Sequence, residues 1–228
     1  YPAAAVILAT GGASYPSTGS TGDGYRIAEA VGHTITRLRP ALVPLVVQEV
    51  LLAKSMQGVS LRNVRLTAYQ CRASEIDPSL TPTRDVGRGT GHEKPPRPII
   101  ESRKGEMLMT HFGISGPITL QMSLAIVDAL GKGPVSVSID LQPDLSEKQL
   151  HQLLQQDFEL HGARGLKHAA AKLLPHKMVE PFVEMSGIPP DKLVNQVSTS
   201  ERKRLVGLLK SLRFNIKSSL PLAAAMVT

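Results

Sequence analysis

The sequence predicts a mixed α/β protein in which a β-rich region is interrupted by a helical insert, and three observations lead to this fold class. An apolar run, a glycine-rich turn and an amphipathic helix follow one another within residues 1–40. Two stretches between residues 45 and 143 alternate apolar and polar residues, the period of half-buried strands. Between residues 144 and 213 apolar residues recur at helical spacing, and strand-like residues return after them.

The first region predicts the βα unit of an α/β domain. The run Val6 to Leu8 is continuously apolar, as in a strand covered on both faces. Asp23 is placed to cap the helix that follows, and Gly32 is placed to end it. A short strand and a proline-flanked extended crossover then lead into the β-rich region.

The β-rich region contains two alternating strands, around Val64 to Ala68 and around Val135 to Ile139. Residues 81–98 are rich in proline and glycine, so we expect a mobile surface loop there. The pair Gly116-Pro117 predicts the start of an apolar helix that runs to about Leu130.

The helical region carries two capping boxes, which are signatures of a helix N-terminus. They are Ser146 to Gln149 and Ser198 to Glu201, and each precedes leucines at helical spacing. Prolines at 175, 181, 189 and 190 divide the interval between them into short helices.

Composition describes an ordinary soluble chain of 228 residues, with 42% hydrophobic residues and a net charge of +7. Aromatic residues make up 4% and tryptophan is absent, which argues against single-stranded nucleic acids bound by base stacking. The basic residues are scattered, and we interpret the densest group, Arg202 to Arg204, as a solvated helix face. A net positive field still favours anionic cofactors or substrates.

Cys71 is the only cysteine, so neither an internal disulfide nor a cysteine-based metal cluster is expected. The sequence shows no basic-then-apolar leader and no apolar run near the roughly 20 residues that span a bilayer. We therefore expect a cytoplasmic protein without a membrane partner. Because the chain opens into one apolar strand and ends in another, we also expect it to be a piece of a longer protein.

A glycine-rich segment between Leu8 and Tyr25 is the strongest functional lead. Glycine lets a ligand approach the backbone closely, and a strand–turn–helix exposes amides to a cofactor. The segment lacks the Gly-Lys-Ser/Thr ending of a P-loop and a G-x-G-x-x-G directly after a strand. A capping carboxylate on Asp23 would repel a phosphate, so the loop suits a ring system or a sugar better. Alternatively, its glycines serve only tight turns.

A second segment, Gly105 to Pro117, again leads from a strand through small residues into a helix. His111 lies in this loop and is our candidate catalytic residue, as a proton donor or a polar anchor. The alternative is a histidine with a packing role only. The remaining histidines show no metal-ligand spacing, and no G-x-S-x-G elbow is present, so we expect neither a zinc site nor a serine nucleophile.

Several ordered motifs resemble the BaiN/YhiN-like family of NAD(P)/FAD-dependent oxidoreductases. They are Ala9 to Gly12, Ser14 to Tyr25, Gly32 to Ile35, Pro40 to Leu45, Gly105-Glu106, Thr110 to Pro117 and Asp140 to Asp144. The resemblance covers nearly the whole chain, and its motifs occur in the family's order.

The resemblance implies a Rossmann-like FAD-binding domain interrupted by a β-barrel insert that carries a helical subdomain. Residues 1–42 would belong to the FAD domain, 43–143 and 214–228 to the barrel, and 144–213 to the helical subdomain. The family's N-terminal G-x-G-x-x-G and its glycine-rich C-terminal portion are not found here. We therefore expect an internal fragment that does not hold FAD tightly, and is inactive, on its own.

The function implied is that of an FAD-dependent oxidoreductase that transfers a hydride between flavin and a small organic substrate, with NAD(P)H as the candidate reductant. We expect the cofactor or substrate cavity to be bordered by Thr10, Gly11, Gly12, Ser14, Tyr15, Pro16, Thr18, Gly19, Gly22, Asp23, Thr110, Gly113, Ser115 and Gly116. The alternative is a non-catalytic interaction module for a nucleic acid or a protein.

Overall fold

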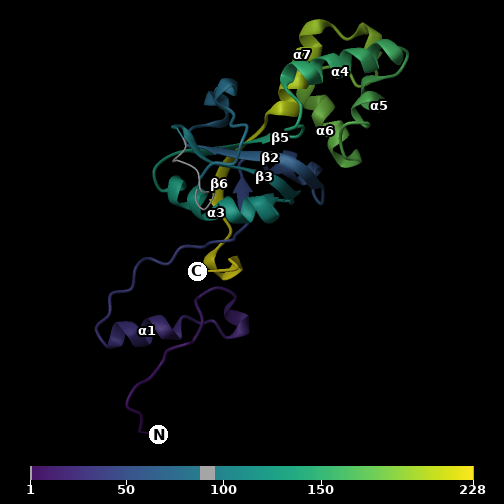
Figure 1. The fold of residues 1–228 in the computed structure, drawn as a ribbon. Helices are drawn as coiled ribbons and strands as arrows, with labels where there is room; N and C mark the ends of the chain where they lie inside the picture. Colours follow the sequence, from purple (N-terminus) through teal and green to yellow (C-terminus); the bar gives the residue numbers. More distant parts are fainter. Residues whose placement is uncertain (1, 88–95, 228) are drawn as a thin grey trace.

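The computed structural model describes residues 2–87 and 96–227 and contains a closed β-barrel, a helical subdomain and an N-terminal segment (Figure 1). The barrel strands are antiparallel and follow the order β1-β4-β3-β2-β5-β6. They are β1 (Leu45–Val47), β2 (Ser60–Tyr69), β3 (Ile99–Met109), β4 (Gly113–Ser115), β5 (Val135–Asp140) and β6 (Leu212–Ser219). Because β6 follows the helices and pairs with both β5 and β1, the predicted β region with a helical insert is confirmed.

The barrel core is apolar and is covered by helix α3 (Pro117–Leu130), which packs against β3. Ile118, Met122 and Ile126 on α3 are buried in the same cluster as the inward residues of β2 and β5. The helix begins and ends where Gly116-Pro117 and Leu130 predicted. A second short helix, α2 (Val50–Ser55), was not predicted from the sequence.

Strand β5 differs from its prediction because all of its residues are buried. Alternation predicted an exposed polar face, yet Ser136, Ser138 and Asp140 are covered. The segment that follows β2 packs over β5 and β6, and its Ile76 and Val86 join Tyr69 and Ile99 in a second apolar cluster. Alternation therefore identified the strand, while the tertiary cover decided its burial.

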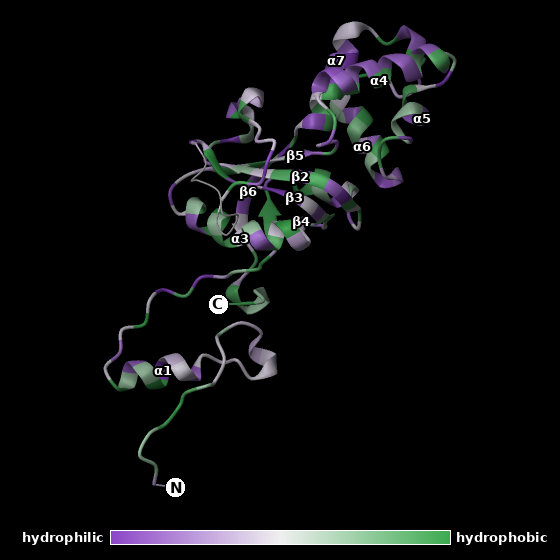
Figure 2. Ribbon diagram, in the orientation of Figure 1, coloured by the Kyte–Doolittle hydropathy of each residue, from purple (hydrophilic) through white to green (hydrophobic). Residues whose placement is uncertain are grey.

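The helical subdomain lies beyond the β5 end of the barrel (Figure 1). Its helices are α4 (Glu147–Leu160), α5 (Leu166–Ala170), α6 (His176–Ser186) and α7 (Thr199–Lys210). Both capping boxes are confirmed, with Gln149 N donating to Ser146 Oγ at 3.3 Å and Glu201 N to Ser198 Oγ at 3.2 Å. Figure 2 shows hydrophilic residues on the outer turns of α4 and α7, whereas β2 carries hydrophobic residues together with Arg62, Asn63 and Arg65.

One proline in this subdomain does not have the predicted effect. Pro181 lies inside α6 instead of dividing two helices. The burial of Met178, Val179, Phe182 and Val183 around it explains this, since the packed face stabilises the helix despite the hydrogen bond that proline cannot donate.

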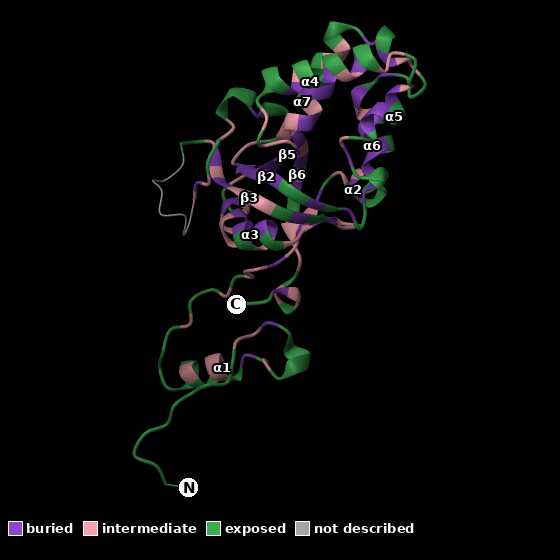
Figure 3. Cartoon of the chain, turned by 45° about the vertical axis from the view of Figure 1, so that its right-hand side comes forward, coloured by how far each residue is buried: buried purple, intermediate pink, exposed green. Residues whose placement is uncertain are grey.

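The N-terminal segment, residues 2–40, contains helix α1 (Asp23–Ala30) and no strand. The strands predicted at Val6 to Leu8 and after Gly32 are therefore wrong for this structure. The side chains of Val6 and Ile7 are 78% and 91% exposed, and no described residue pairs with their backbone. An extended segment forms a strand only beside a neighbour that satisfies its hydrogen bonds. Figure 3 shows that most of this segment is exposed.

The last residues also differ from their prediction. β6 accounts for the strand expected after residue 213, but the chain then forms a turn at Leu222–Ala224, and Val227 forms an isolated bridge with Ala41. The predicted loop at 81–98 includes residues 88–95, which lie outside the described residues.

We keep residues 1–42, residues 43–143 with 214–228, and residues 144–213 as a proposed division of the chain into domains. Within the described ranges, every helix is too short or too polar to cross a membrane.

Candidate functional site

The glycine-rich segment at residues 10–25 folds against itself. Gly22 N donates to Gly12 O at 3.2 Å and so joins the two halves of the loop just before α1. A Cβ on Gly24 would lie 2.2 Å from Thr10 Oγ1, and one on Gly11 would lie 3.0 Å from Ser20 Oγ. The loop's own hydroxyl side chains therefore occupy the space that two of its glycines leave open.

The start of α1 does not follow the predicted cap. The N-cap is Gly22 in a left-handed conformation, and no side chain caps the helix. The Asp23 carboxylate instead pairs with Arg26, and hydrogen bonds from Arg26 and Thr21 lower the pKa of Asp23 below its ordinary value. The expectation that Asp23 occupies the helix amides is wrong, although its negative charge still stands at the helix N-terminus.

The other predicted contact residues of this segment differ in exposure. Ser14 is buried, whereas Tyr15, Pro16, Thr18 and Gly19 are exposed. Tyr15 has a positive φ and opens the short turn Pro16–Thr18, and a Cβ on Gly19 would meet nothing within 4 Å. These residues present an open strip of small and hydroxyl groups.

The second segment forms the turn between β3 and β4. Thr110 N donates to Gly113 O at 2.8 Å, and Gly113 N donates to Thr110 Oγ1 at 3.1 Å. This turn holds His111 on the surface, with its ring edge-on to Phe112 at a centroid distance of 4.9 Å. His111 is thus accessible to a ligand, as a proton donor must be.

Two glycines of this segment have a structural role in the barrel. A Cβ on Gly113 would lie 2.3 Å from Leu45 O, and one on Gly116 would lie 2.8 Å from Met107 Cα. The neighbouring strands β1 and β3 approach so closely that only glycine fits. Close approach of backbone to backbone accounts for these glycines without a ligand, and Ser115 between them belongs to β4.

The two segments are not joined directly in the described part of the chain. No hydrogen bond between described residues links 10–25 to 110–116, and the views of Figures 1 and 3 place the barrel and α1 on opposite sides of the C-terminal turn. Tyr15 N in the first segment instead donates to Ala223 O, at 3.3 Å.

Exposed hydroxyl groups and backbone amides are donors suited to a flavin cofactor. The exposed strip from Tyr15 to Gly19 and the uncapped start of α1 offer hydroxyl groups and amides to a cofactor. Gly11 and Gly24, whose open space the loop itself fills, do not form a cradle.

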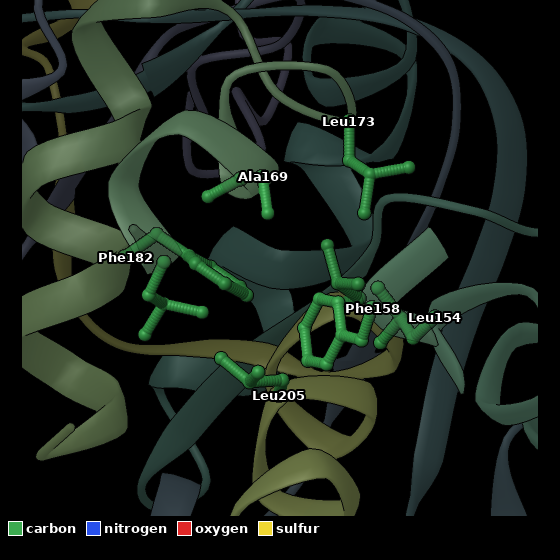
Figure 4. A pocket seen from close by; sticks show the side chains of 9 residues that line it. Leu154, Phe158, Ala169, Leu173, Phe182 and Leu205 are labelled. Carbon is green, nitrogen blue, oxygen red and sulfur yellow. The ribbon is translucent and has the colours of Figure 1, made fainter. Parts of the chain in front are cut away.

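An apolar pocket in the helical subdomain is not a comparable site (Figure 4). Figure 4 shows side chains from all four helices of the subdomain converging on it. Its lining is entirely apolar: Leu154, Phe158, Leu166, Ala169, Ala170, Leu173, Phe182, Leu205 and Leu209. A ligand site needs a few polar groups to orient its ligand, so we interpret this space as part of the core.

Charged groups buried in the barrel were missed by sequence reasoning. Asp140 is almost fully buried, and this burial raises the pKa of its carboxyl, while a 2.6 Å ion pair with Lys210 opposes the shift. Arg65 on β2 is also buried and pairs with Asp85 at 2.9 Å. In the sequence, Arg65 and Asp140 are each a charge within an alternating strand pattern, and Asp140 also begins the motif Asp140 to Asp144. The described residues hold no cluster of three or more His, Cys, Asp or Glu side chains suited to a metal ion.

Comparison with known proteins places the chain in a family. Residues 97–227 match the model described as "HI0933-like protein barrel and H2TH domain". The chain is 31% identical to the ribosomal RNA dihydrouridine synthase of Haemophilus influenzae, over 92% of this chain and 43% of that protein. It is 28% identical to the Escherichia coli protein of the same name, over 91% and 43% of the two chains.

A third relative carries a different name. The 3-dehydro-bile acid delta(4,6)-reductase of Clostridium scindens is 26% identical over 96% of this chain and 47% of that protein. The chain thus spans a little under half the length of these curated relatives. The family match covers more than half of the chain and includes most of its barrel and all of its helical subdomain. The chain therefore belongs to the HI0933-like family, the BaiN/YhiN-like flavoproteins that its motifs resemble.

Proposed function

We propose that the protein containing these 228 residues is an FAD-dependent reductase that saturates a carbon–carbon double bond conjugated to a carbonyl group. The observation that carries this proposal is the similarity, over nearly the whole chain, to relatives with two different names. A dihydrouridine synthase, by its name, forms a saturated uracil ring. A 3-dehydro-delta(4,6)-reductase, by its name, acts on double bonds in conjugation with a 3-keto group.

Both conversions add one hydride and one proton across a carbon–carbon double bond. The hydride goes to the carbon distal to the carbonyl group, and the proton goes to the carbon beside it. Reduced flavin, when bound, would supply the hydride, and we propose NAD(P)H as the reductant that restores the reduced flavin. We assign the open strip from Tyr15 to Gly19, with Thr10 and Gly12, to contacts with the cofactor.

His111 is the residue that we assign to the proton. Its side chain is exposed on a turn fixed by two hydrogen bonds of Thr110, and imidazole exchanges protons near neutral pH. An exposed side chain on a fixed turn is suited to meet a substrate that approaches the barrel from outside. We expect FAD binding and activity in the full-length protein and not in residues 1–228 alone.

Two substrate classes follow from the names of the relatives, a uracil ring within ribosomal RNA and a small enone. The test is reoxidation of the reduced full-length protein, without oxygen, by an rRNA fragment or by a 3-keto-Δ4 steroid. Recovery of oxidised flavin absorbance with either compound, at a rate that saturates with its concentration, supports the proposal. If neither compound reoxidises the flavin, the proposed reaction is wrong.

The second candidate function is a non-catalytic RNA-binding module. The net charge of +7 and the two relatives named for ribosomal RNA favour it. Binding of rRNA that weakens steeply with salt, by a full-length protein without flavin, would support this candidate over the reductase.

A further inference from the structure

The chain passes between the barrel and the helical subdomain twice, and the two crossings lie side by side. One crossing leads from β5 into α4, and the other leads from α7 into β6. Leu141 N in the first crossing donates to Leu209 O in the second at 2.8 Å. The two crossings occupy a small region around residues 140–146 and 209–212, and α2 on the barrel also contacts α6 of the subdomain.

Lys210 occupies the centre of this region. Its Nζ lies 2.6 Å from Asp140 Oδ2, 2.7 Å from Leu145 O and 3.0 Å from Gln142 O. An ammonium group has three N–H donors, so these acceptors use its full capacity. One side chain at the end of α7 thus holds the end of β5 and the turn that leads to Ser146, the N-cap of α4.

The surroundings make this arrangement rigid. The Lys210 and Asp140 side chains are only 15% and 7% exposed, and the second Asp140 oxygen accepts from Gln142 N at 2.9 Å. Arg65 is the other charged group close to Asp140, and it is itself paired with Asp85. An ion pair that is buried and hydrogen-bonded in this way is strongly disfavoured from opening, because opening leaves a charge without a partner.

The other polar links between the two parts are more exposed. Asp144 accepts from Asn63 at 2.7 Å and pairs with Lys104, and Lys177 Nζ donates to Gln57 O at 3.1 Å. Exposed links of this kind hold two bodies only weakly, since water competes for the same groups.

We propose that Lys210, with its acceptors on Asp140, Gln142 and Leu145, fixes the orientation of the helical subdomain relative to the barrel. Lys210 is a positioning residue, and its role is independent of the proposed reaction. Any ligand that contacts both the barrel and the helices would depend on the orientation that it sets.

The test is a distance distribution between spin labels on the two parts, measured by double electron–electron resonance in the 228-residue chain. The labels are placed at K132C, on the exposed turn after α3, and at A163C, on the exposed turn after α4, in a C71S background. The variants are K210M and the double variant D140N/K210M, which leaves no buried charge without a partner. K203M is the matched control, an exposed lysine on the same helix.

The expected result is one narrow distribution in the labelled parent and in K203M, and a broader or shifted one in both Lys210 variants, with the circular dichroism of the folded chain retained. A merely structural role would lower stability without broadening the distribution of the folded molecules. The proposal is overturned if D140N/K210M keeps the parent distribution or if the parent itself is broad. Failure of both variants to fold would also overturn it, because the pair would then serve the fold and not the orientation.

Discussion

The barrel with its helical subdomain and the N-terminal segment use similar motifs in physically different settings. In the first, each strand has neighbours on both sides and glycines sit where backbones nearly touch. In the second, Ser14 and Gly22 are the only buried residues between 2 and 40, and an apolar run is exposed. A strand–glycine–helix pattern therefore indicates close backbone packing in the barrel, but it does not indicate a packed strand in the N-terminal segment.

The difference separates structural glycines from candidate contact residues. Gly113 and Gly116 are required by the barrel whether or not a cofactor binds, while Gly19 has open space around it and is favoured only by the positive φ of 97° with which it ends the turn Pro16–Thr18. The contact role that we propose is consequently better supported for the exposed strip of the N-terminal segment than for the glycines of β4.

The largest expected effect is that of Gly113→Ala on the barrel. The new Cβ would collide with Leu45 O at 2.3 Å, so β1 and β4 could not pair as they do. We expect the free energy of unfolding in urea to fall by about 3 kcal/mol or more.

Gly131→Ala is the matched control for this change, since its Cβ would come no closer than 3.7 Å to Asp128 O. Equal stability of the two variants would show that Gly113 does not serve barrel closure.

The next effect concerns His111, the residue in the turn between β3 and β4 that we propose as the proton donor. In the full-length protein, His111→Asn should slow reoxidation of the reduced flavin by substrate roughly 100-fold, because the proton donor is lost. The thermal midpoint should not change, since the side chain is exposed. His168→Asn, an exposed histidine of the helical subdomain, is the control. A parent-like rate in His111→Asn would remove the assigned role.

A smaller effect is expected from removing one hydroxyl hydrogen bond, and we compare this loss in the helical subdomain and in the N-terminal segment. Ser198→Ala removes the N-cap of α7 and should lower the free energy of unfolding by about 1 kcal/mol. Thr18→Ala also removes a hydroxyl hydrogen bond, to Tyr15 O at 2.7 Å, but lies in the exposed N-terminal segment. Its effect on the main unfolding transition should be undetectable, and comparable losses would mean that the two regions unfold as one unit.

The smallest effect is the pH dependence of the same cap. Hydrogen bonds from Lys192 and from the backbone of Ser198 lower the pKa of Glu201 from its ordinary 4.5 to about 2. A lowered pKa contributes stability above the unfolded value, and this contribution is lost as the pH falls through the folded value. The difference in unfolding free energy between the parent and Glu201→Gln should be constant near neutrality and shrink between pH 4.5 and about 2. If the difference in unfolding free energy stayed the same down to about pH 2, the pKa of Glu201 would not be lowered by its hydrogen bonds in the folded chain.

Local signals in the sequence were sufficient for much of the helical structure. Ser146, Ser198 and Pro117 each mark a helix start at the position where the structure has it, because capping depends on residues three positions apart. The closure of the barrel could not be predicted from such local signals. β1 and β4 have three residues each, too few for a visible alternation, and their pairing joins residues far apart in the chain.

The candidate site was predictable only in part. The motifs located the Tyr15–Gly19 strip and the His111 turn. Asp23, however, does not cap α1 as predicted, because its carboxylate pairs with Arg26. Lys210 and Asp140 lie 70 positions apart and belong to different elements, so no local pattern could associate them. Tertiary contacts determine such pairs.

The absorbance spectrum of the purified full-length protein tests the central claim most directly. We expect a yellow protein whose flavin absorbance is bleached, in the absence of oxygen, by NADH or NADPH. A colourless full-length protein that takes up no added FAD would show that the protein is not a flavin-dependent reductase.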